Sequence, residues 1–448
     1  MASFANKVSI ESVVLTTNRI IPSRGSKEID ITGLTQQINI FENITQPYLT
    51  GAMTIFDDHD MFNLLDISGT EKVIFTFAPE PYVRSSGRRI TKTFITTSVS
   101  SEKSNDATSL LYVELIEDHG YIDGLINFSK SYTGTAESIV EKILQDKLEK
   151  TMLTTPRNLS AQPFFKYIVP YLSPLQAASM ITKKMTTIDG YPFFLYSTLF
   201  SDKLVLKDFK TMVNTTPFNE KTPFKYSQAT NSSNLPLDQL YNLDTFDHAT
   251  NEDTLSMAMV GAVATELNHL SATTLEEFTT RMIIPNELAK ADIDLRRKSP
   301  LVDGRFTPGK EDDKSLFSFT SNVFNSLEMD TYRDANNYSQ NGTLEQARLK
   351  AIRHGVISFI AKNTYVMSGP GMIFTSGNMA TTVGNQAQIS VQRNEFAQNN
   401  SGRSENIDEK RSGNFVMTAR KYMFDVADQT VSFTMDCARI FNDKKINR

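Results

Sequence analysis

The chain has 448 residues, of which 40% are hydrophobic and 22% are charged, and its formal net charge is −5. This length and composition predict a globular protein of about two to four domains and exclude an intrinsically disordered one. The weakly acidic balance disfavours a protein that grips nucleic-acid phosphates.

The chain contains one cysteine, Cys437, which excludes an internal disulfide and a cysteine-rich zinc site. This usage is typical of a reducing cytoplasm, and we expect the thiol to be an inert core group. The first fifteen residues lack a basic segment followed by a long apolar one, so no signal peptide is expected. No apolar run approaches the roughly 20 residues of a membrane helix, so no membrane span is expected.

Short runs with alternating apolar and polar residues fill the first 120 positions. Turn-forming residues separate them, which predicts an antiparallel β unit. The expected strands are 8–17, 34–44, 51–58, 71–78, 92–100 and 109–118.

From about Phe128 the pattern changes to helical spacing. Residues 134–150 place apolar side chains on one helical stripe (Ile139, Ile143, Leu144 and Leu148), with Glu137 in the first turn. A second helix is predicted at 173–185, with Ser173 as the N-cap, Pro174 at the first helical position and Gln176 completing a capping box. Residues 191–209 then predict a hairpin that turns at Ser201 and Asp202.

Strand-like sequence returns after about Val213, including a hairpin formed by 261–270 and 273–282. Loop residues dominate 285–342, which predicts an insertion. A helix is expected at 343–360, with Thr343 and Gln346 as a capping box and Ala347, Ala351 and Phe359 facing inward.

The end of the chain predicts a strand, a long exposed loop and a final hairpin. The strand is 364–377, which runs into a Pro-Gly turn, and the loop is the Asn-, Gln- and Ser-rich stretch 377–411. The hairpin at 412–440 alternates cleanly: Val431, Phe433, Met435 and Cys437 lie on one face, and Thr430, Ser432, Thr434 and Asp436 lie on the other.

Two groups of residues partly match known phosphate-binding or cation-binding motifs, but neither match is complete. The segment 304–310, GRFTPGK, has P-loop spacing, but Glu311 stands where a Ser or Thr should bind Mg²⁺. Asp57, Asp58, His59 and Asp60 could hold a cation, although a strand-end turn explains them as well. No HExxH or Gly-x-Ser-x-Gly motif is present, and Met180, Met185 and Phe359 are expected in the core. We therefore predict no catalytic, cofactor-binding or metal-binding residues.

The segment 48–77, YLTGAMTIFDDHDMFNLLDISGTEKVIFTF, resembles the first barrel of baseplate hub proteins of contractile-tailed bacteriophages. The capped helix SPLQAASMITKKM followed by DGYPFFLYS looks like their α+β module. The segments GAVATELNHLSATTLEEFTTRM and SGNFVMTARKYMFDVADQTVSFTM, with the helix between them, look like a split second barrel and its final hairpin.

The resemblance implies an α+β, β-rich fold with two tail-tube-like antiparallel β-barrels. The first barrel would span 1–125, the α+β module 126–212, the split second barrel 213–284 and 343–448, and the insertion 285–342. Three subunits would form a ring of six barrels that adapts a sixfold tail tube to a threefold central spike.

Such a hub would be a structural protein and not an enzyme. Its partners would be two further copies of itself, the central spike, the tube or tube-initiator protein and other baseplate proteins. DNA would pass through the lumen without specific binding. The protein would be assembled in the host cytoplasm and would reside in the virion, or in a phage-derived injection machine. Strand edges and the 377–411 loop are the expected contact surfaces.

Two other functions remain open from the sequence. A tail-associated hydrolase of cell-wall glycan would need a pocket with paired carboxylates. A carbohydrate-binding adhesin would need an exposed aromatic platform, for which the candidates are Tyr82, Tyr121, Tyr332 and Tyr338.

Overall fold

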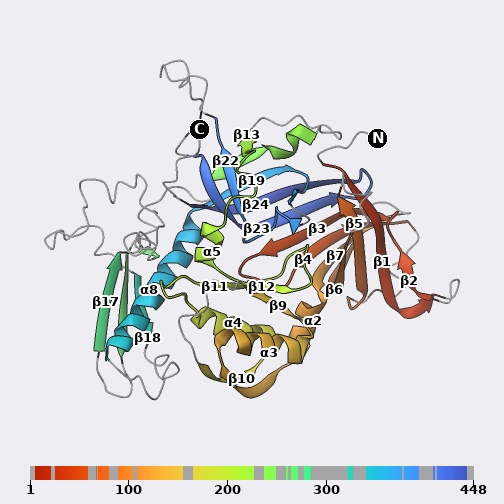
Figure 1. Cartoon of the computed structure of the whole chain (residues 1–448). Coiled ribbons are helices and arrows are strands. Elements are labelled where there is room, and N and C mark those ends of the chain that lie inside the picture. The colour runs from red at the N-terminus through yellow and green to blue at the C-terminus, as the bar shows by residue number, and fades with distance from the viewer. Residues whose placement is uncertain are drawn as a thin grey trace, which may run out of the picture.

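A computed structural model describes residues 6–21, 26–58, 67, 69–79, 89–103, 108–154, 165–226, 237–248, 259–260, 264–270, 277–283, 321–325, 340–375, 378–392, 407–408 and 411–440. A mainly antiparallel 14-stranded sheet dominates these residues, and few helices accompany it (Figure 1). The β-rich class predicted from the sequence is therefore confirmed. None of the described helices is both long enough and apolar enough to cross a bilayer.

The N-terminal part of the large sheet has the strand order β3-β4-β7-β6-β5-β1-β2. Its strands are β1 (Val8–Ile21), β2 (Ser26–Asp30), β3 (Thr35–Asn43), β4 (Thr50–Asp57), β5 (Lys72–Pro79), β6 (Ile90–Lys103) and β7 (Ser109–Glu117). All six predicted strands are confirmed, and β2 is the strand that the sequence pattern did not indicate. Along β4 buried and half-buried residues alternate strictly, as expected for a strand with one face on a core.

The elements that follow are helices interleaved with small sheets. They are α2 (Asp118–Leu125), β8 (Phe128–Gly134), α3 (Ala136–Leu148), β9 (Met152–Thr154), β10 (Phe165–Leu172), α4 (Pro174–Lys184), β11 (Phe193–Tyr196), β12 (Leu204–Asp208) and α5 (Phe209–Asn214). Both predicted helices and the β11–β12 hairpin are confirmed, whereas α2, α5 and the β8–β10 pair were not predicted.

Local sequence explains why the two predicted helices form where they do. The apolar stripe of α3 is buried as expected, and Thr135 caps its first turn by accepting a hydrogen bond from the Ser138 amide. The Ser173 side chain accepts from the Gln176 amide at the start of α4, which confirms that N-cap. Met180 differs from expectation: it lies on the outer side of α4 and is 37% exposed.

The C-terminal part of the large sheet is built around a long hairpin. Its elements are β13 (Phe224–Tyr226), the 3₁₀ helix η2 (Leu237–Tyr241), β14 (Asn242–Leu243), β15 (Thr245–His248), β19 (Thr364–Pro370), β22 (Gln386–Ser390), β23 (Gly413–Asp425) and β24 (Thr430–Ile440), with a short pair β20 (Phe374–Thr375) and β21 (Asn378–Met379) apart from the sheet. The predicted alternation of β24 is confirmed, because its four inward residues are all buried.

The stretch 377–411 was expected to be a long exposed loop, and this is wrong for the described residues up to 392. Gln386 and Gln388 lie in strand β22 and are buried. The Gln386 amide donates to the Val213 carbonyl, and the Gln388 backbone amide donates to the Asn219 side chain. Polar composition therefore misled the prediction, because distant partners satisfy these groups inside the core. Most of the remaining stretch, including 393–406, lies outside the described residues.

A separate three-stranded sheet has the order β17-β16-β18 and packs against helix α8 (Figure 1). Its strands are β16 (Ala264–Leu270), β17 (Glu277–Ile283) and β18 (Ser321–Asn325), and α8 spans Gln340–Lys362. The predicted hairpin is confirmed as the β16–β17 pair, but it joins a strand of the 285–342 segment and not the large sheet. Helix α8 begins at Gln340, so Thr343 lies inside the first turn and is not its N-cap.

In the part of the chain that the structure describes, buried apolar side chains form four clusters. One fills the N-terminal strands, one lies between α3, α4 and the small sheets, and one fills the C-terminal strands. The fourth joins α8, including the predicted core residue Phe359, to α5 and β11. The β23–β24 hairpin contributes to three of them, which makes it the central element of the core.

Candidate functional site

The described residues contain no cluster of three or more His, Cys, Asp or Glu side chains that could hold a metal ion. Asp57 is buried at the end of β4 and Asp58 is exposed, whereas His59 and Asp60 fall outside the described part of the chain. The P-loop-like segment 304–310 and the tyrosines at 82, 332 and 338 also fall outside it, and Tyr121 is half-buried on α2.

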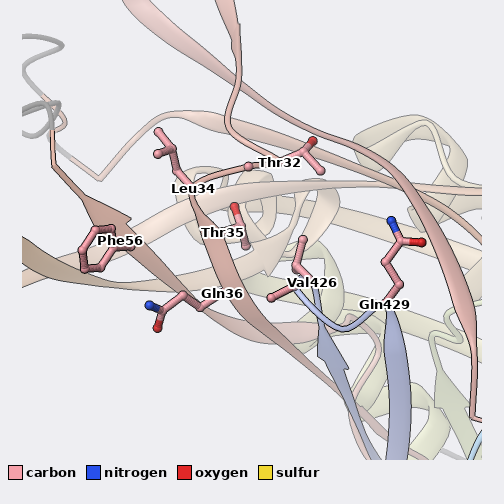
Figure 2. A pocket seen from close by; sticks show the side chains of 9 residues that line it. Thr32, Leu34, Thr35, Gln36, Phe56, Val426 and Gln429 are labelled. Carbon is pink, nitrogen blue, oxygen red and sulfur yellow. The ribbon is translucent and has the colours of Figure 1, made fainter. Parts of the chain in front are cut away.

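A pocket of about 480 Å³ lies at the tip of the β23–β24 hairpin. Figure 2 shows Leu34 and Phe56 on one side of it and Val426 and Gln429 on the other. The residues that line it are Thr32, Gly33, Leu34, Thr35, Gln36, Phe56, Val426, Ala427 and Gln429. None of them titrates, so this pocket offers no acid or base for catalysis.

Glu42 on β3 is a buried carboxylate with four hydrogen-bond donors around it. It accepts from the backbone amides of Leu199 (2.5 Å) and Val383 (3.3 Å) and from the hydroxyls of Thr382 (3.0 Å) and Tyr422 (3.2 Å). Burial raises the pKa of the Glu42 carboxyl above its usual value, and the hydrogen bonds offset part of that rise. The carboxylate thus joins three separate segments of chain to β3.

Glu117, at the end of β7, makes a second buried junction. Its carboxylate accepts from the Leu49 amide (3.0 Å), the Ser197 hydroxyl (2.7 Å) and the Lys92 ammonium (3.3 Å). Lys92 also donates to the Ser201 carbonyl at 2.7 Å. Glu42 and Glu117 together therefore hold the segment that links β11 to β12 against the N-terminal strands.

These contacts bear on the hydrolase hypothesis. Both carboxylates are 3% exposed or less and accept backbone amides, which is the pattern of structural anchors. A general acid or base has to reach a substrate proton, whereas the oxygens of both carboxylates are buried and accept hydrogen bonds from the protein. This pair of buried carboxylates therefore gives the hydrolase reading no support.

Arg420 on β23 is the largest fully buried side chain among the described residues. Its guanidinium carbon lies 4.1 Å from the centre of the Phe433 ring and 4.8 Å from that of Tyr422. Burial lowers the pKa of Arg420, while Tyr422 and Glu42 favour its charged form. The cation therefore lies between aromatic rings that belong to two different apolar clusters.

The outer face of the large sheet crosses from the C-terminal strands to the N-terminal ones without a break. One row of directly paired residues runs across seven strands, from β15 to β7: Thr245, Ser368, Thr434, Lys421, Phe41, Thr50 and Ile116. The rows of this face carry the carboxylates of Asp247, Asp436, Asp425 and Glu114 and the ammonium of Lys421. The face is broad, half-exposed and acidic.

Exposed apolar side chains gather on the helix-containing part of the chain. Leu125, Ile168, Tyr171 and Ile188 are each at least 69% exposed. Tyr171 also has a positive φ of 52°, which is rare for a non-glycine residue. Single exposed apolar side chains are common on protein surfaces, so these four residues do not by themselves mark a contact site.

Two solved structures share this fold across nearly the whole chain. A tail protein from Neisseria meningitidis MC58 matches with a TM-score of 0.51 and 12% identity, covering 96% of both chains. The 43 kDa tail protein of prophage MuSo2 from Shewanella oneidensis matches with a TM-score of 0.53 and 10% identity, covering 96% of this chain and 98% of that one. No protein-family model and no curated protein matches the sequence. The chain thus has the fold of these two tail proteins.

Proposed function

We propose that the protein is a structural component of a phage-type tail, and specifically the baseplate hub of a contractile tail. The observation that carries the proposal is the continuous outer sheet face, which passes from one β unit to the other through the β3–β23 pairing. The fold shared with two tail proteins supports the same role. The protein would act through contacts with other proteins and not through a catalytic site.

The hub role requires two barrels in each chain. We propose that residues 1–125 form the first barrel and that 126–212 form the α+β module between the barrels. Strands β13–β15, together with 343–448, would form the second barrel. The β16–β17 hairpin and β18 would then form an appendage held by α8, since these three strands pair with each other. The β-bridge and hydrogen bonds that join residues 6–8 to residues 429–431, at the starts of β1 and β24, favour a closed first barrel.

The symmetry of the proposed assembly explains why each chain would have two barrels. Three chains with two barrels each would present six similar units to a sixfold tube and a threefold face to a central spike. Closing the ring would also cover sheet edges that otherwise promote aggregation. Partners would therefore be two further copies, the spike, the tube or its initiator, and other baseplate proteins. The site of action would be the virion after assembly in the host cytoplasm, or a related injection machine.

The acidic outer face suits the wall of a DNA conduit. Four carboxylates against one ammonium would repel a passing polyanion, so DNA would slide without adhering. Its cross-strand rows include small hydroxyl side chains such as Thr434, Ser368 and Thr50, interspersed with the exposed rings of Phe41 and Tyr112.

The test is the solution mass of the purified chain by light scattering, followed by electron microscopy of the same sample. A ring at three times the 50.3 kDa chain mass is the expected result. A second sample would contain Thr434→Cys protein, because the native Cys437 is buried and unreactive. A thiol label at that position should appear in the central channel of the ring. A monomer that degrades cell-wall glycan would overturn the proposal.

A further inference from the structure

We propose that the C-terminal hairpin β23–β24 is the element that locks the two β units into one cooperatively folding block. The N-terminal unit would then be complete only after β24 has been made. This inference concerns the stability of the single chain and does not depend on the proposed role in a tail.

A β-bulge at Thr418 lets one strand serve both units. The pairing of β23 with β24 shifts register between Met417 and Ala419. Before the shift Phe415 and Met417 point into the C-terminal cluster, and after it Tyr422 and Phe424 point into the N-terminal cluster. The extra residue therefore keeps the inward side chains on the core side while the neighbouring strand changes.

The change of neighbour occurs at the same place. Residues 413–416 of β23 pair with β22, and residues 419–425 pair with β3. The Thr418 carbonyl accepts from the Ile44 amide at 2.9 Å, which starts the new pairing. One side of β23 thus pairs with the C-terminal unit along the first part of the strand and with the N-terminal unit along the rest.

The far end of the hairpin also binds the first strand. Lys7 and Thr430 form a β-bridge, the Val8 amide donates to the Gln429 carbonyl at 3.0 Å, and the Val431 amide donates to the Asn6 carbonyl at 2.8 Å. The hairpin therefore covers one edge strand of the N-terminal unit, β3, and the start of β1, whereas β2 is the other edge strand of this unit. Without the hairpin, the β3 edge, the start of β1 and the adjoining core would face water.

The aromatic contacts of β23 also change along its length, from the C-terminal cluster to the N-terminal one. The Phe424 ring lies 5.1 Å from Phe75 and 4.8 Å from Phe77, both on β5. The Phe415 ring lies 5.4 Å from Tyr365 on β19. Between them stands Arg420, stacked on a ring from each cluster. Loosening either half of the hairpin should therefore loosen both units, because the same backbone connects them.

The experiment is hydrogen exchange with mass spectrometry on the full chain and three variants. Phe424→Ala and Phe415→Ala are matched, since both remove a fully buried phenyl ring from the same strand. We expect each to accelerate exchange in both β5 and β19 by a similar factor, on the order of 100-fold. The third variant, Leu144→Ala, removes a buried side chain from α3 and should accelerate exchange in α3 far more than in β5 or β19.

Two outcomes would overturn the proposal. If Phe424→Ala changed only β5 and Phe415→Ala changed only β19, the units would be independent. If Leu144→Ala accelerated β5 and β19 as strongly as the hairpin variants do, cooperativity would belong to the whole chain and not to the hairpin. Should either alanine variant fail to fold, Phe424→Leu and Phe415→Leu give the same comparison with smaller effects. The light-scattering test of ring formation is a separate measurement. If no ring were found, the hydrogen-exchange result would still stand.

Discussion

The guanidinium carbon of Arg420 lies 4.1 Å from the centre of the Phe433 ring, and the two residues sit on neighbouring strands of the C-terminal hairpin. From the sequence alone, Phe433→Asp is expected to bury an unpaired carboxylate and unfold the surrounding unit. The structure changes that expectation, because the new carboxylate would face a buried cation. The cost of Phe433→Asp should then be mainly the lost ring packing, about 3 kcal/mol.

A double-mutant cycle tests this relationship. Combined with Arg420→Met, Phe433→Asp should cost more than the sum of the single changes, by about 1–3 kcal/mol, since the carboxylate then has no cation. Combined with the same Arg420→Met, Phe433→Ala should cost less than the sum, because both changes remove one cation–π contact. Urea unfolding of the six proteins gives both coupling energies. Couplings of the same sign would contradict this account.

Glu42 should make the free energy of unfolding depend on pH. Its folded-state pKa is raised above 4.5 by burial, so the folded state holds the proton more tightly than the unfolded state does. Stability from this group is therefore full below about pH 4.5 and is lost as pH rises through the folded pKa. Glu42→Gln removes the titration, so above about pH 4.5 its unfolding free energy should fall less steeply with pH than that of the wild type. Parallel pH profiles would show that Glu42 is not the cause.

Sequence patterns predicted local features well and long-range ones poorly. The inward face of β24 and the Ser173 cap follow from neighbouring residues, and both are confirmed. The partners of Glu42 lie 157 residues away at Leu199 and 341 away at Val383, and no local period connects them. The Thr418 bulge also has no signature, because the residues around it are buried on both faces and read as one continuous strand.

Gly384 should not tolerate even a methyl group. Its φ is +78°, and a Cβ atom there would lie 2.1 Å from the hydroxyl oxygen of the buried Tyr196. Gly384→Ala should therefore lower the free energy of unfolding by about 1–3 kcal/mol. Gly33→Ala is the matched control, since no atom lies within 4 Å of the added Cβ, and it should change stability by less than about 0.5 kcal/mol. Equal shifts in melting temperature for the two variants would rule out the steric explanation.

Lys92 on β6 should matter more to stability than Lys207 on β12, although both ammonium groups donate to a backbone carbonyl. Lys92 alone of the two also donates to a buried carboxylate, that of Glu117. Lys92→Met would leave that carboxylate without a cation at a cost of about 3–5 kcal/mol, whereas Lys207→Met would lose one hydrogen bond to a neutral carbonyl, about 1 kcal/mol. Adding Glu117→Gln should restore part of the Lys92→Met loss, because the amide needs no cation. Chemical unfolding measures all three. If Lys92→Met proved no worse than Lys207→Met, the Glu117 junction would not be what holds the β11–β12 segment to the N-terminal strands.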